Sequence, residues 1–206
     1  MSSVPAREGM DFPLGIVCPT APIHPRGSEG ICTRRRSGDT LASCESIMSV
    51  SARLSQYFDQ LGLRVEVSEH RFSRSSAQTA RLAHVAPQLI AKSVILEDDA
   101  GFVMAVIPAD RYVMLGRLAG LLGRPALHLS DENRIAAVFG DCDRGAVPPV
   151  GMAWGVETVV DDELEGHDVV YLEGGDHRRL LKMSGAEFGA LMRAVWHGRF
   201  SKSLLH

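Results

Sequence analysis

Three stretches of the chain carry groups that could act chemically on a ligand. Lys92 directly precedes the apolar run SVIL, which would place its ammonium group at the mouth of a strand. In the segment Gly145–Gly151, glycines flank two prolines, and this favours a rigid loop whose backbone N–H groups can approach an ester or a carboxylate. The segment EGGDH ends at His177, a histidine on a glycine turn that could bind a ligand or transfer a proton.

Each stretch also has an ordinary structural interpretation. A lysine at a strand end can lie along apolar neighbours and keep its charge in solvent. Glycine and proline build tight connections between elements, and a hairpin turn can expose a histidine that has no function. Taken one at a time, these interpretations are the commoner ones, so the order of the three stretches along the chain must decide between them.

The spacing of apolar residues predicts the elements that would position these groups. The runs 93–98 and 102–109 are rich in β-branched residues and are separated by an Asp/Gly turn, which indicates a hairpin, with helix as the alternative. Gly62 is expected to end the first helix. Helices are predicted over residues 54–61, 75–82, 112–122, 131–139 and 186–196, and further strands over 64–69, 157–160, 169–172 and 180–183.

These elements are interspersed without a regular βαβ repeat. The expected fold class is therefore α+β, a mostly antiparallel mixed β-sheet or open barrel surrounded by helices. Residues 1–47, rich in Pro, Gly, Ser and Arg, have no apolar periodicity and are expected to be a disordered tail or to precede the true start at Met48. Residues 48–206 are expected to form a single domain.

Composition limits the class of protein. Hydrophobic residues make up 45% and charged residues 23% of the 206, as in ordinary soluble globular proteins. No apolar run approaches the roughly 18 residues of a membrane span, and the first residues lack the pattern of a signal peptide. We therefore expect a cytoplasmic protein without a membrane partner.

Charge and cysteine content narrow the chemistry further. The net charge of −3 argues against an extended nucleic-acid coat, although the excess of basic residues between Arg64 and Lys92 could hold a few phosphates. Four scattered cysteines without a CxxC pair predict neither a zinc site nor a disulfide framework. Cys142, in a Gly-rich loop, leaves a thiol hydrolase open as an alternative, although no histidine is recognisable as its partner.

Several features follow one another in a recurring order between residues 56 and 182. They are His70 with Ser75 five residues on, the stretch Pro87–Ile95 containing Lys92-Ser93, the LGRP sequence at 122–125, a Gly-x-x-x-Pro loop at 145–149 and a Gly-Gly-x-His turn ending at His177. This order resembles the YbaK-type aminoacyl-tRNA deacylase family, which also occurs as the editing insertion of bacterial prolyl-tRNA synthetases. Where relatives commonly have Lys-Thr, this chain has Lys92-Ser93.

The resemblance implies the editing-domain fold and hydrolysis of aminoacyl-tRNA without a metal or another cofactor. Lys92 matches the family's essential lysine and His177 a histidine found in several members, so both are expected to be catalytic. The Gly-x-x-x-Pro loop is expected to hold the aminoacyl end of the substrate. The expected substrate-binding residues are Gly145, Ala146, Val147, Pro148, Pro149, Gly151, Gly175, His70 and Ser75.

Hydrolysis of an aminoacyl ester needs a positioned water, a stabilised oxyanion and a proton route to the ribose oxygen. We expect N–H groups of the loop to polarise the carbonyl, Lys92 to anchor the terminal nucleotide or the developing charge, and His177 to orient the ribose. The expected partners are the acceptor end of an aminoacyl-tRNA and an aminoacyl-tRNA synthetase, and the amino acid removed would be Ala, Cys, Ser or Thr. The alternative is a catalytically silent module that binds an amino acid or aminoacyl-tRNA on the same fold.

Overall fold

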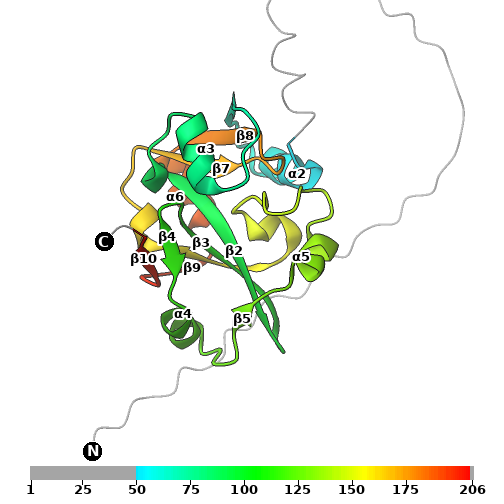
Figure 1. Ribbon diagram of the computed structural model, residues 1–206, viewed down its shortest axis with the longest axis vertical. Coiled ribbons are helices and arrows are strands. Elements are labelled where there is room, and N and C mark those ends of the chain that lie inside the picture. The colour runs from blue at the N-terminus through cyan, green and yellow to red at the C-terminus, as the bar shows by residue number, and fades with distance from the viewer. Residues whose placement is uncertain (1–49, 205–206) are drawn as a thin grey trace, which may run out of the picture. The chain divides into compact units, whose positions relative to one another are not determined.

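A long β-hairpin forms the centre of the fold. The computed structural model of the protein describes residues 50–204 (Figure 1). Strands β2 (Ile90–Asp98) and β3 (Gly101–Pro108) pair antiparallel without a break in register, from Ala91 opposite Pro108 to Asp98 opposite Gly101. The predicted hairpin is confirmed. Strand β2 begins earlier than expected, so Lys92 lies within the strand rather than at its mouth.

The remaining strands extend this hairpin on both sides into a mixed sheet. Across the sheet the order is β1 (Glu66–Glu69), β8 (Arg179–Ser184), β7 (Val169–Glu173), β2, β3, β6 (Glu157–Asp161) and β9 (Trp196–Gly198), and β5 (His128–Leu129) pairs with the far end of β2. Strands β4 (Arg111–Val113) and β10 (Ser201–Ser203) form a separate ribbon. Among residues 50–204, five pairings are antiparallel and three are parallel, which confirms the predicted mixed, mostly antiparallel sheet.

Short helices surround the sheet, and side-chain caps fix where several of them begin. The helices are α2 (Ala52–Leu61), α3 (Ser76–Leu82), α4 (Leu115–Leu122), α5 (Glu132–Val138) and α6 (Gly185–Met192), with 3-10 turns η2 (Pro87–Leu89), η3 (Gly151–Trp154) and η4 (Asp162–Leu164). Ser184 and Glu187 form a capping box at α6. Gly62 ends α2, as predicted, and it does so in the left-handed conformation. Figure 1 shows α3 near one end of the central hairpin and α4 and β5 near the other.

Two predicted helices are too long. The helix predicted over 112–122 begins only at Leu115, because Tyr112 lies in β4 and pairs with Lys202 of β10. The helix predicted over 186–196 ends at Met192, and Trp196 starts β9, which runs parallel to β6. In both places, pairing with a strand distant in sequence overrides the local helical spacing. The predictions for residues 1–47 lie outside the described residues.

The two faces of the sheet are covered by different apolar clusters. Ile95 packs in a large cluster with Leu172 and Phe188, whereas the next residue, Leu96, packs in a second cluster with Phe200. Because side chains alternate along a strand, Ser93 faces the same way as Ile95 and Lys92 the same way as Leu96.

None of the helices formed by residues 50–204 has the length and apolar character needed to cross a lipid bilayer.

A buried polar network joins the end of β7 to α3 and to the turn that carries His177. Glu173 is only 6% exposed, and one of its carboxylate oxygens accepts a hydrogen bond from the Thr79 hydroxyl at 3.2 Å. The Thr79 hydroxyl lies 2.7 Å from the Ser73 hydroxyl. Ser73 in turn donates to the His177 carbonyl through its backbone N–H at 3.1 Å and its hydroxyl at 3.3 Å. These bonds position the His177 turn.

Burial is the largest influence on the pKa of the Glu173 carboxyl group. Burial raises the pKa of this carboxyl group, while the Thr79 hydrogen bond and the nearby rings of His70 and His177 oppose the rise and Asp176 adds to it. The second carboxylate oxygen, Oε2, is buried without a hydrogen-bond partner among the described residues. Burial therefore makes ionisation of Glu173 less favourable than that of a carboxyl group in solvent.

We predict that Glu173→Gln reduces the pH dependence of stability. The folded-state pKa is higher than the unfolded value, so the unfolded chain releases this proton at lower pH and the folded state retains it. In the wild type, the contribution of Glu173 to the free energy of unfolding therefore falls as pH rises from the ordinary carboxyl range through the raised pKa. Urea unfolding at about pH 5 and about pH 8 should show that the variant lacks this decline.

Glu66→Gln, at an exposed position on β1, is the control for this measurement. If the free energies of unfolding of wild type and Glu173→Gln changed in parallel with pH, Glu173 would not be the titrating group.

Candidate functional site

The Gly145–Gly151 loop is attached to the central strand. The Ser93 hydroxyl on β2 donates to the Val147 carbonyl at 2.7 Å, and residues 146–151 are buried. Gly151, where η3 begins, has no room for a side chain, since an added Cβ would lie 2.5 Å from the Thr158 hydroxyl. Gly145 adopts a positive φ of 81°. These constraints explain why glycines flank the prolines and confirm that the segment is a tightly held loop.

Few of the loop's backbone N–H groups are free to bind a ligand. Ala146 and Val150 donate within the loop or to its start, at 3.0 and 2.8 Å, and the two prolines carry no N–H. No acceptor among residues 50–204 bonds to the N–H of Gly145, Val147 or Gly151. Gly145 and Val147 also line the pocket described below, so their N–H groups are the two candidate donors for a carbonyl oxygen.

A pocket of about 270 Å³ lies beside the loop, between β2 and α5. The wall of the pocket combines apolar side chains with two serines and one carboxylate. It also includes Gly145 and Val147, the two candidate N–H donors of the loop. The lining residues are Ser93, Val94, Ile95, Leu129, Ser130, Glu132, Ile135, Gly145 and Val147. A small, mostly apolar cavity with a few polar groups suits a small organic group.

The His177 turn lies against the start of this loop. The His177 Nε2 atom is 2.8 Å from the Arg144 carbonyl, and the Asp143 N–H donates to the Gly175 carbonyl at 2.8 Å. His177 has a positive φ of 59°, which few non-glycine residues adopt. In the neutral ring, an Nε2–H that donates to Arg144 leaves Nδ1 as an acceptor. The structure thus brings the two predicted stretches together and leaves the His177 Nδ1 atom without a hydrogen-bond partner among the described residues.

Lys92 is not part of this assembly. Its ammonium group donates to the Ala109 carbonyl at 3.1 Å and faces away from Ser93 and the loop. Burial lowers the pKa of Lys92, and the charge of Asp110 opposes that shift. Lys92 does not line the pocket, and no hydrogen bond or ion pair joins it to the described loop or to His177. The sequence could not show this, because the facing of one side chain depends on the register of β2.

The remaining predicted residues have structural partners. Ser75 is the N-cap of α3, where its hydroxyl accepts a hydrogen bond from the Gln78 N–H at 3.3 Å. The backbone N–H of His70 donates to the Arg178 carbonyl at 2.8 Å, and the ring Nδ1 lies 2.8 Å from the Arg71 carbonyl. The ring Nε2 is buried with no partner among the described residues. Both residues support the segment that holds the His177 turn.

Cys142 does not have the properties of a nucleophile. Its thiol is more than half buried, and burial together with the negative charges of Asp141 and Asp143 raises its pKa to about 12, against an opposing hydrogen bond from Ser51. A reactive cysteine needs a lowered pKa, because the thiolate is the nucleophile. A thiol pKa raised by burial does not favour the thiol hydrolase considered from the sequence.

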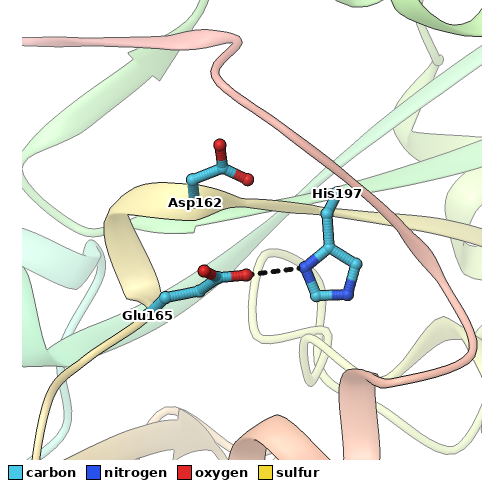
Figure 2. A group of neighbouring side chains, drawn as sticks. All are labelled: Asp162, Glu165 and His197. Atoms are coloured by element: carbon cyan, nitrogen blue, oxygen red, sulfur yellow. Dashed lines mark hydrogen bonds and ion pairs between the residues drawn. The ribbon is translucent and has the colours of Figure 1, made fainter.

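Three side chains outside this site lie close enough together to hold a metal ion. Donor atoms of Asp162, Glu165 and His197 lie within 4.8 Å of one another (Figure 2). Figure 2 shows the imidazole of His197 pointing toward Glu165. The His197 Nδ1 atom lies 2.9 Å from a carboxylate oxygen of Glu165. The opposite nitrogen lies 2.9 Å from the Met192 carbonyl, and Arg199 lies 3.7 Å from Asp162. Local ion pairs account for these groups, none of which lines the pocket, so we assign no metal to them.

Sequence reasoning missed several residues that support the site. Ser73 and Thr79 carry the network to His177, and Ser93 anchors the loop. Hydroxyl side chains of this kind are common in turns and strands, so sequence alone did not distinguish them. Phe72, whose ring lies 5.3 Å from that of His177, was also missed. The sequence feature that could have indicated Phe72 is an aromatic residue between two arginines, in a segment without apolar periodicity.

Comparison with known proteins identifies the family. Residues 70–191, more than half of the chain, match the aminoacyl-tRNA editing domain family. Proline–tRNA ligase of Xanthomonas oryzae pv. oryzae is 33% identical over 91 residues, which are 44% of this chain and 16% of the ligase. The enzyme of Thermosipho africanus is 33% identical over 78 residues, which are 38% of this chain and 14% of the ligase. The matched part is thus a small fraction of those enzymes.

Solved structures show the same fold. The crystal structure of the protein APE2540 has a TM-score of 0.64 and 28% identity, covering 73% of this chain and 99% of that one. A protein described as a candidate trans-editing enzyme for prolyl-tRNA synthetase has a TM-score of 0.65 and 21% identity, covering 74% and 97%. Together with the family match, these likenesses show that the chain belongs to the aminoacyl-tRNA editing family, of the YbaK type.

Proposed function

We propose that this chain is a trans-acting deacylase that hydrolyses the ester between a small, wrongly attached amino acid and tRNA. The observation that carries the proposal is the pairing of the Gly145–Gly151 loop with the His177 turn beside a pocket of about 270 Å³. Family membership supports the reaction class. An apolar pocket distinguishes one methylene by only about 1–3 kcal/mol, so charging errors with small amino acids need a separate hydrolytic site.

The proposed reaction uses the free donors of the loop. Water attacks the ester carbonyl carbon, and the carbonyl oxygen, as it becomes an oxyanion, accepts hydrogen bonds from the N–H groups of Gly145 and Val147. The bond between this carbon and the ribose oxygen then breaks, and that oxygen takes up the proton that the attacking water has given up, as the free amino acid leaves. The Nδ1 atom of His177 accepts a hydrogen bond from the neighbouring ribose hydroxyl or from the attacking water. Each oxyanion donor typically contributes about 100- to 1000-fold in rate.

Lys92 has a separate role in this proposal. Its ammonium group carries three hydrogens, and the Ala109 carbonyl takes one of them. The other two remain for a phosphate of the terminal nucleotides, with which a half-buried cation interacts more strongly than an exposed one. Lys92 then anchors the RNA from the other side of β2 rather than stabilising charge in the pocket.

We predict that the wild type releases one small amino acid, either Ala, Cys or Ser from tRNA-Pro or Ser or Thr from another tRNA. The variant Lys92→Ala should lower the second-order rate constant of this deacylation roughly 100-fold. Lys202→Ala, at an exposed lysine on β10, is the matched control and should act as wild type. Filter assays on a panel of mischarged tRNAs measure the release. Full activity of Lys92→Ala would remove Lys92 from the mechanism, and release from no tRNA would favour a silent binding module.

We predict that His177→Asn lowers the single-turnover rate roughly 100-fold and leaves binding of uncharged tRNA within about twofold. Asparagine tolerates the positive φ of this position, so the backbone of the turn should persist, while the imidazole is lost together with its free Nδ1 and its Nε2 bond to Arg144. His84→Asn is the matched control, because His84 also has a positive φ, of 55°. Equal rates for wild type and His177→Asn would show that the ring takes no part in hydrolysis.

A further inference from the structure

An exposed aromatic ring lies at the edge of the candidate site. Phe72, on the segment between β1 and α3, is 44% exposed and so is not part of the core. Its ring centre is 5.3 Å from that of His177, with the planes tilted by 57°. The guanidinium carbon of Arg178 lies 5.5 Å from the centre of the same ring. A large apolar ring is thus presented to solvent next to the proposed ribose-binding histidine.

Positive charges without counter-ions surround this ring. Arg71 and Arg74 flank Phe72 in the chain, and Arg178 stacks on it; all three are exposed. Among residues 50–204, no carboxylate forms an ion pair with any of the three. The nearby carboxylates of Glu69 and Asp176 are already paired with Arg179. The surface around Phe72 therefore has an uncompensated positive charge.

A fourth arginine extends this surface toward the loop. The carbonyl of Arg144 binds the His177 ring, and its guanidinium donates to the side-chain carbonyl of Asn133 at 3.2 Å without a carboxylate partner among the described residues. Arg144 directly precedes Gly145, whose N–H is one of the two candidate donors. Arg144 thus adds a cationic side chain beside the proposed oxyanion site, from a segment whose backbone is bonded to the His177 ring.

This combination fits an unpaired nucleotide. Bases of single-stranded RNA stack on aromatic rings and on arginine planes, and their phosphates pair with neighbouring arginines. A base-paired nucleotide cannot offer its face to a side chain, because the face is already stacked within the duplex. An acidic peptide would match the charge but would leave the exposed face of Phe72 unused.

We propose that Phe72 and Arg178 form a stacking platform for an unpaired nucleotide at the 3′ end of tRNA, and that Arg71, Arg74 and Arg144 bind its phosphates. The inference rests on the proposed function, since it identifies how the aminoacyl end would be held while the ester enters the pocket. A base on Phe72 would place its ribose near His177, which lies 5.3 Å away, and the ester near Gly145.

The test compares binding of two uncharged RNA hairpins, one with a single-stranded ACCA 3′ tail and one that ends blunt. Wild type should prefer the tailed hairpin. Phe72→Leu, which keeps an apolar side chain but removes the ring, should weaken tailed binding roughly five- to hundredfold. Phe72→Tyr should bind within about threefold of wild type, because it keeps the ring face. Tyr112→Leu, at a ring 42% exposed on β4, is the matched control and should bind as wild type.

The arginines are tested by salt dependence. For the tailed hairpin, Arg71→Gln with Arg74→Gln should reduce the slope of log K against log salt by about 0.7 for each phosphate that the variant no longer neutralises. An unchanged slope would remove these arginines from the platform. Equal binding of tailed and blunt hairpins by the wild type, or unchanged tailed binding by Phe72→Leu, would overturn the platform.

These results separate the platform from the hydrolytic activity. If the wild type hydrolyses a mischarged tRNA but Phe72→Leu binds and hydrolyses as well as wild type, the platform is overturned and the deacylase stands. If no tRNA is hydrolysed but Phe72→Leu loses tail-dependent binding, the platform stands and the deacylase is overturned. Circular dichroism of both Phe72 variants checks that each is folded.

Discussion

The hydrogen bonds that join the His177 turn to Asp143 and Arg144, directly before the Gly145–Gly151 loop, are the constraint on which the site depends. Two bonds of 2.8 Å, from the Asp143 N–H to Gly175 and between His177 and Arg144, hold two segments together that are about thirty residues apart. The loop is also anchored by Ser93 and the turn by Ser73. Without these bonds, the free N–H groups and the histidine ring would belong to separate surface loops, and neither could act on a shared ligand.

The electrostatic arrangement divides the site into two sides. Glu173 is buried behind the His177 turn, where burial raises its pKa and its hydrogen bond with Thr79 supports the segment that holds the turn. The unpaired arginines lie on the outer side, around Phe72. A substrate with a phosphate chain and a neutral ester therefore meets positive charge at the surface and mainly apolar walls inside the pocket.

Local patterns in the sequence predicted most of the fold but not the short strands. The hairpin of β2 and β3 was predictable because its strands are long, β-branched and joined by an Asp/Gly turn. Strands β4, β9 and β10 have three residues each and exist through pairing with distant partners, so Tyr112 and Trp196 were assigned to helices. For the site, the resemblance to the deacylase family indicated the loop and the turn. The side of the sheet to which the Lys92 side chain points, in contrast, follows from the register of β2. The exposure of Phe72 had no periodic signal in the sequence.

The most direct test of the account is a crystal structure with an aminoacyl-adenosine analogue in which an amide replaces the ester. The analogue's carbonyl oxygen should lie about 2.7–3.1 Å from the backbone nitrogen of Gly145 or Val147. The ribose should lie beside the His177 ring and the amino-acid side chain in the pocket between β2 and α5. Binding of the analogue elsewhere, for example on the Lys92 face of the sheet, with the loop and His177 unoccupied, would contradict this placement.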